Sequence, residues 1–295
     1  MESEARMPRE EAARALRAAE AVQARAAGVP RGHAVLQLLH AVMMSAYMAV
    51  FVYTGSDAVD TETAGGMLMM LVLPPIVISS GLVSGAGERY AGRLRAGRRY
   101  WLAVGVFLAM LLVLMAWRIL GGGYPVWVVA VSAAVTLVIF AARPISSLRR
   151  ADTGVRAEVP AVPLPHGVRV TTVMIGAGFG GACATVFLPT AGWLVVSALM
   201  LFTIMALAGS SSWSLRSTGW CWGGAQWTAF GASSAILFAL AVLLIATDAV
   251  SPVVPVAMGA VIAASLVGVA FLPGRGEGED DFAHDEGAGD GAPEA

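Results

Sequence analysis

Eight stretches of mainly apolar residues, each about 20 residues long, dominate the sequence and limit what it can fold into. A helix of that length crosses the roughly 30 Å hydrocarbon core of a bilayer. Only 13% of the 295 residues are charged, well below the roughly 25% typical of soluble domains. The pattern therefore predicts an all-α, polytopic membrane protein. The eight predicted spans are 34–54, 66–86, 100–119, 124–143, 168–188, 191–209, 227–247 and 252–272.

All nineteen basic residues are arginine, and their positions predict the direction of the spans. Cytoplasmic loops of membrane proteins collect basic residues. With a cytoplasmic N-terminus, eighteen arginines fall on the cytoplasmic side and only Arg118 lies outside. The predicted external loops instead hold Asp57, Asp60, Glu62 and Asp248. We therefore expect a multi-pass protein of the cell membrane with both termini in the cytoplasm.

Composition divides the chain into five parts. Residues 1–32 are charged and alanine-rich and predict a short cytoplasmic helix, whereas 274–295 combine eight acids with many glycines, as in disordered tails. Two four-helix membrane halves, 33–146 and 168–273, are joined by a cytoplasmic linker at 147–167. A shift of 127 residues carries spans two to four almost onto spans six to eight. The halves are therefore candidates for a parallel internal repeat, with chance alignment of apolar segments as the alternative.

Gly176, Gly178 and Gly181 have the G-x-G-x-x-G spacing of dinucleotide-binding folds. Such a fold needs an acidic residue about 20 positions later, but the next acid in this sequence is Asp248. The glycines therefore favour close packing of membrane helices over a nucleotide site. A second ridge of small residues in the eighth span is the predicted packing partner. The predicted packing residues are Gly176, Gly180 and Gly181 in span five and Ala260, Ala264 and Gly268 in span eight.

Ionisable side chains at membrane depth are costly and point to function. His40 is the best candidate, because Gln37, His40, Met44 and Tyr47 follow helical spacing and give the first span one polar face. A proton relay or a substrate contact is one interpretation of His40. A histidine that hydrogen bonds to a neighbouring helix is the structural alternative.

A double proline, Pro74-Pro75, lies in the middle of the second span and is followed by Ser79 and Ser80. Prolines free backbone carbonyls that solutes can use, although kinked membrane helices without a ligand are also common. Arg118 and Asp248 lie near the outer ends of their spans, where they could pair, form an entrance charge or reach the interface. The candidate substrate pathway therefore comprises His40, Tyr47, Pro74, Pro75, Ser79, Ser80, Arg118 and Asp248.

No known enzymatic motif appears in the sequence, so we assign no catalytic residue, cofactor or metal ligand and expect a protein that is not an enzyme. A cluster of methionines around His40 would suit Cu(I), but gap-filling in a helical core predicts the same residues. The lipid bilayer is the expected partner, with a membrane or cytoplasmic protein as a second possibility and no nucleic acid. We expect a permease-like protein, or the membrane subunit of a transporter for a small solute. The alternative is a non-transporting scaffold or accessory protein.

Overall fold

The computed structural model describes residues 31–56, 64–88, 98–120, 123–150, 161–209, 211–247 and 249–275, which are almost entirely helical. The predicted N-terminal helix, residues 276–295 of the acidic tail and residues 151–160 of the linker lie outside the described residues, as do Asp248 and the acids of the first external loop.

Each predicted span overlaps one helix of the described chain, and a short helix that was not predicted, α8, lies between the sixth and seventh. Six helices are long and apolar enough to cross a membrane, namely α2, α4, α5, α6, α7 and α9. Shorter apolar stretches occupy Leu71–Gly87 of α3 and Val253–Val269 of α10. The helices are α2 (Arg31–Thr54), α3 (Ala64–Glu88), α4 (Arg98–Ile119), α5 (Val126–Arg150), α6 (His166–Ala184), α7 (Pro189–Ala208), α8 (Leu215–Cys221), α9 (Gly224–Ala246) and α10 (Val253–Val269).

The connection between the fifth and sixth predicted spans is a tight helical hairpin. Helix α6 ends at Ala184, where the Thr185 amide still donates to the Gly181 carbonyl. Pro189 then occupies the first turn of α7, a position where its missing N–H costs nothing.

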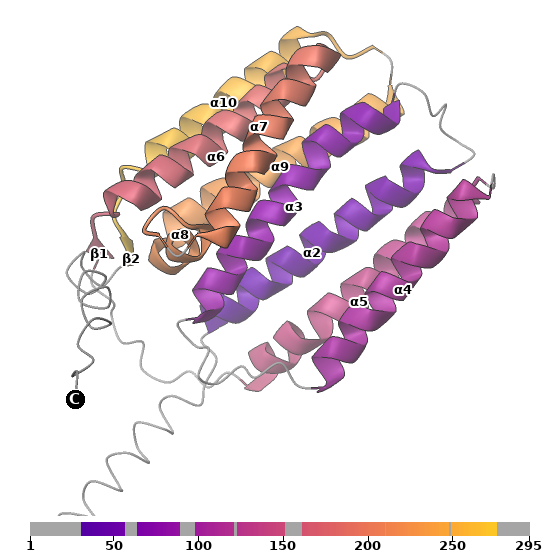
Figure 1. Cartoon of the computed structure of the whole chain (residues 1–295), viewed down its shortest axis with the longest axis horizontal. Helices are drawn as coiled ribbons and strands as arrows, with labels where there is room; N and C mark the ends of the chain where they lie inside the picture. The colour runs from indigo at the N-terminus through magenta and orange to yellow at the C-terminus, as the bar shows by residue number, and fades with distance from the viewer. Residues whose placement is uncertain are drawn as a thin grey trace, which may run out of the picture.

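Helix pairing follows the same scheme at the two ends of the chain (Figure 1). Helix α2 packs along α5, and α6 packs along α10, so the first and last apolar helices of each predicted half lie together. Helices α2 and α3 lie between the α6–α10 pair and the α4–α5 pair (Figure 1). Helix α3 is central, since it contacts α2, α6, α7, α8 and α9.

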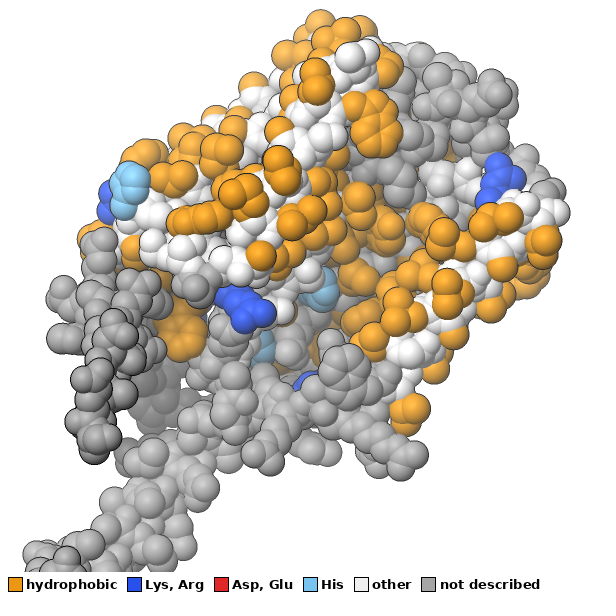
Figure 2. All heavy atoms as spheres, in the orientation of Figure 1, with side chains coloured by type: hydrophobic (Ala, Val, Ile, Leu, Met, Phe, Trp, Pro, Cys, Tyr) orange, Lys and Arg blue, Asp and Glu red, His pale blue; other side chains and the backbone are white. Residues whose placement is uncertain are grey.

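Two apolar clusters hold the helices together. The larger joins α2 and α3 to helices α6–α10, with Phe179 and Phe230 fully buried at a ring separation of 5.8 Å. The smaller lies between α2, α4 and α5 and contains Phe107, Leu114 and Tyr124. Phe107 and Leu114 are the only buried residues among those of α4 whose side chains are described. Most of α4 therefore presents an apolar surface to the surroundings (Figure 2).

Glycines allow two pairs of helices to approach closely. A Cβ atom on Gly180 of α6 would lie 2.6 Å from the Gly259 carbonyl oxygen, and one on Gly259 of α10 would lie 2.4 Å from the Gly180 oxygen. Helices α3 and α8 cross in the same way, because a Cβ on Gly85 would lie 2.0 Å from the Arg216 oxygen. Both are contacts of backbone with backbone, which a larger residue would force apart.

The structure places Gly176 and Gly180 against α10 and Gly181 against Val195 of α7. On α10, however, the contact face differs from the predicted ridge. The residues that meet α6 are Gly259, Ala263 and Leu266, whereas Ala260, Ala264 and Gly268 are exposed. The predicted ridge is thus wrong by one position. Both faces of α10 contain small residues four apart, so spacing alone does not select the buried face.

The chain segments that flank the second half are tied together at one end of the bundle. Strand β1 (Ala161–Val162) pairs antiparallel with β2 (Gly274–Arg275). Beside them, the fully buried Gln226 side chain accepts from the Gly223 amide at 3.0 Å and donates to the carbonyls of Val269 (3.0 Å) and Leu272 (3.1 Å). One side chain thus supplies hydrogen-bond partners for backbone groups at the start of α9 and at the end of α10.

Candidate functional site

A hydrogen bond between two helices brings together two of the predicted pathway residues. His40 Nδ1 of α2 lies 2.9 Å from Ser79 Oγ of α3. The Ser79 hydroxyl itself donates to the Ile76 carbonyl at 2.8 Å. Because a hydroxyl has one proton, we assign the proton of the first bond to His40 Nδ1, which donates to Ser79 Oγ. In this tautomer His40 Nε2 carries a lone pair.

A second polar contact lies two turns from His40, towards the start of α2. The Gln37 amide nitrogen donates to His33 Nε2 at 2.9 Å. His33 is 3% exposed and packs on the end of α3, where a Cβ on Gly87 would lie 3.4 Å from its ring. The His33–Gly87 and His40–Ser79 contacts fix an antiparallel register between α2 and α3.

The exposed stripe of α3 continues this polar surface. Ser80 and Ser84 are exposed, although most of the α3 side chains around them are buried. Each donates to its own helix, Ser80 to the Val77 carbonyl (2.7 Å) and Ser84 to the Ser80 carbonyl (2.8 Å). We call the polar side chains that α2 and α3 present here the α2–α3 seam. It comprises His33, Gln37, His40, Ser79, Ser80 and Ser84.

The surface is hollowed beside these helices. Figure 2 shows a depression between the helices around α3, α7 and α8 and the α4–α5 pair, with histidine side chains at its floor. Helix α5 forms the other wall, since the ring of Phe140 lies edge-on to His40 with centroids 6.5 Å apart. Ser45, further along α2, also joins this helix to α5 by donating to the Ala133 carbonyl at 2.8 Å.

The double proline does not interrupt α3, which runs as a continuous helix through the buried Pro74 and Pro75. Prolines cannot donate to the preceding turn, so the α-helical path leaves carbonyls without their usual partners there. By the antiparallel register, Met44 and Tyr47 of α2 lie at the level of these prolines. Tyr47 is half-buried and stacks on Phe51 at a centroid distance of 6.0 Å.

Arg118 is not part of the α2–α3 seam. It lies in the last turn of α4 and is exposed, near the start of α5, where the hydroxyl of Tyr124 donates to the Leu114 carbonyl. Asp248, its predicted companion, lies outside the described residues. The pairing of these two charges stays a prediction. The seam thus unites His40, Ser79 and Ser80 from the predicted pathway and leaves Arg118 apart.

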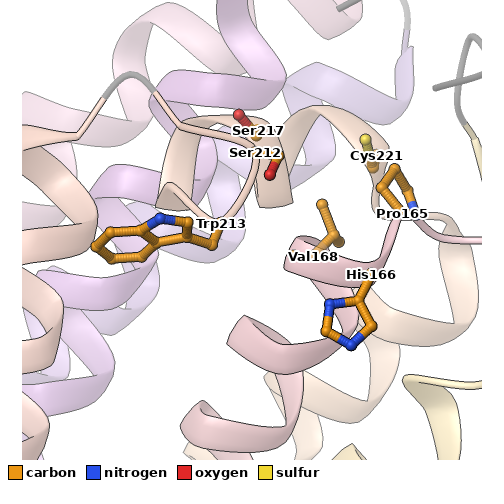
Figure 3. Close-up of a pocket in the computed structure, with 8 residues that line it drawn as sticks. Pro165, His166, Val168, Ser212, Trp213, Ser217 and Cys221 are labelled. Carbon is orange, nitrogen blue, oxygen red and sulfur yellow. The ribbon is translucent and has the colours of Figure 1, made fainter. Parts of the chain in front are cut away.

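A cavity of about 360 Å³ lies elsewhere, at the start of α6 and beside α8 (Figure 3). Its polar groups do not converge, because the His166 ring points away from Ser212 and Ser217. Trp213 packs on Phe202, and Ser217 is bonded to Ser214 Oγ and the Ser211 carbonyl. We therefore take the α2–α3 seam, not this cavity, as the candidate site. The lining residues are Pro165, His166, Gly167, Val168, Ser212, Trp213, Ser217 and Cys221.

In the described part of the chain, no three His, Cys, Asp or Glu side chains are grouped closely enough to hold a metal ion. Met43 and Met48, two of the methionines near His40, are buried in the apolar clusters. They pack as core residues do. The side chains of Met67, Met69 and Met70 are not described.

Comparison with known proteins adds no relative: no family model matches the chain, and no curated protein or solved structure is significantly similar to it. The class of protein therefore rests on the fold. Six helices are long and apolar enough to cross a membrane, which is consistent with an integral, multi-pass membrane protein.

Two members of the seam were missed in the sequence, His33 and Ser84. Both continue patterns that were already visible. His33 is four residues before Gln37 and seven before His40, so it shares their helical face. Ser84 is four residues after Ser80. Following each face by another turn would have found both.

Proposed function

We propose that the chain crosses the cell membrane eight times, as two four-helix halves with both termini in the cytoplasm. The pairing of α2 with α5 and of α6 with α10 supports this arrangement, because a parallel repeat requires equivalent pairs in the two halves. The ends of α2, α5 and α6 that hold Arg31, Arg149 and Arg169 fit a cytoplasmic side under the positive-inside rule.

We further propose that the protein is permease-like, or the membrane subunit of a larger transporter, and that a small solute passes along the α2–α3 seam. The hydrogen bond between His40 and Ser79 carries this proposal. It joins the first helix to the central helix α3, which also contacts α6, α7 and α9 of the second half. In secondary transporters that are built from two repeated halves, the solute binds near the middle of the membrane, between the halves. We propose no enzymatic reaction for this arrangement.

The test is permeation through the purified full chain in liposomes. Solute entry after an osmotic step is followed by stopped-flow light scattering for small polar and ionic solutes. We expect at least one solute to enter faster than into empty vesicles. His40→Phe should abolish the gain, and His40→Gln should retain part of it. His166→Phe is the matched control, since His166 is exposed and lies outside the seam.

The second candidate function is a membrane scaffold or accessory protein. The observation that favours it is the satisfaction of His40, Ser79, Ser80 and Ser84 within the chain itself. Polar side chains that only hold helices together would be arranged in this way. Liposomes that show no permeation by any solute, with a correctly folded protein, would favour the scaffold and contradict the permease.

A further inference from the structure

The hydroxyl protons of the α2–α3 seam are already committed to the protein. Ser79, Ser80 and Ser84 donate to carbonyls of α3 at 2.7–2.8 Å, and the assigned His40 Nδ1 proton goes to Ser79. What these groups still offer is lone pairs, on the exposed Ser80 and Ser84 oxygens and on His40 Nε2.

Gln37, one turn before His40, offers both kinds of group. It uses one N–H to donate to His33 Nε2, which leaves its carbonyl oxygen as an acceptor and its second N–H as a donor. A solute that moves along the seam therefore meets mainly hydrogen-bond acceptors. To be held there in place of water, it must bring donors of its own, because an acceptor that loses water without gaining a partner costs free energy.

The charges around the seam decide between ionic and uncharged solutes. Apart from Glu88, the last residue of α3, no acidic residue occurs in helices α2, α3 and α5, so these helices place no carboxylate near His40, Ser79 or Ser80 to balance a cation. Arg143 of α5 lies close enough to His33 to interact electrostatically and would repel a cation. An anion would need donors beside His40, and the described groups offer acceptors. An ion without a partner is strongly disfavoured at membrane depth.

We infer that the solute is small, uncharged and rich in hydrogen-bond donors, in the chemical class of urea, primary amides and short polyols. This inference rests on the proposed permease function. It names what the α2–α3 seam selects: donors are accepted by serine oxygens and His40 Nε2, cations find no balancing carboxylate beside His40, and anions find no donors there.

The experiment compares solutes of similar size in vesicles that contain the full chain. Urea and glycerol are uncharged donors, trimethylamine N-oxide is a polar solute of no net charge that has acceptors only, and potassium and formate are the ions. We expect urea or glycerol to enter at least about tenfold faster than into empty vesicles, with the other three at background. Entry of potassium, formate or trimethylamine N-oxide instead would overturn the inference and leave the permease function standing. Entry of no solute would overturn both.

Variants locate the selectivity. Ser80→Ala and Ser84→Ala each remove one acceptor, so each should slow urea entry about fivefold, the effect of losing one net hydrogen bond. Ser146→Ala is the matched control, because Ser146 is also exposed and also donates to a carbonyl three residues earlier, at 2.7 Å, but lies near the end of α5. Equal urea entry in all three variants would contradict the role of the seam serines.

Discussion

Replacing Gly259 by alanine tests the helix packing that holds the second half together. The new Cβ would lie 2.4 Å from the Gly180 carbonyl oxygen, whereas ordinary contact begins at 3.4 Å, so α6 and α10 must part by about 1 Å. A gap of 0.5–1 Å forfeits roughly a quarter to a half of the dispersion energy of the facing atoms.

The magnitude follows from two opposing effects. Overpacking in a tight interface costs about 1–3 kcal/mol, while alanine gains about 1 kcal/mol over glycine in a helix interior. We expect Gly259→Ala to lower the free energy of unfolding by up to about 2 kcal/mol. The side chain cannot relieve the strain by rotation, because the opposing atom belongs to the backbone of α6.

Gly268→Ala on the same helix is the matched control. No atom lies within 4 Å of the new Cβ there, and the residue is exposed. The control should therefore be neutral or stabilised by up to about 1 kcal/mol. Unfolding in a detergent–SDS titration, followed by tryptophan fluorescence, measures both. Equal midpoints for the two variants would refute the assignment of the α6–α10 contact.

Two further predictions concern the topology and the end of the bundle. Cysteine at Ala58 should react with an impermeant thiol reagent added outside cells and cysteine at Ala288 should not; the reverse pattern would contradict cytoplasmic termini. Gln226→Leu should cost about 1–3 kcal/mol, because it leaves the Gly223 amide and the carbonyls at Val269 and Leu272 without their buried partner. Thr228→Val, which removes an exposed hydroxyl two residues away, is its control in the same SDS unfolding titration, and equal stability of the two variants would argue against the role of Gln226.

Span-length apolar runs predicted the helices well, because the length of a helix that can cross a bilayer is fixed by bilayer thickness. Helix α8 was not predicted, since Leu215–Cys221 is only seven residues long and contains Gly219, a weak helix former. Its position depends on contact with α3, because Gly85 of α3 and Gly219 of α8 allow the two backbones to meet. That contact is tertiary and leaves no periodic signal in the sequence.

The candidate site was only partly visible in the sequence. His40 stood out because ionisable residues are rare in the spans, and the prolines and serines of α3 marked the second helix. Which residue of α3 faces His40 depends on the register of two helices joined by a long loop, and Ser79 could not be distinguished from Ser80. Arg118 was grouped with them on charge alone, but the structure places it at the exposed end of α4.

Access of water to Ser80 tests the central claim, a polar path along the α2–α3 seam, most directly. Ser80→Cys should react with a membrane-impermeant methanethiosulfonate, because only a hydrated thiol ionises to the reactive thiolate. Leu112→Cys is the control, because Leu112 is exposed on the apolar surface of α4. The native Cys183 and Cys221 are buried and should not react. The account predicts fast labelling of Ser80→Cys and slow labelling of Leu112→Cys in liposomes. Equally slow labelling of both would contradict it.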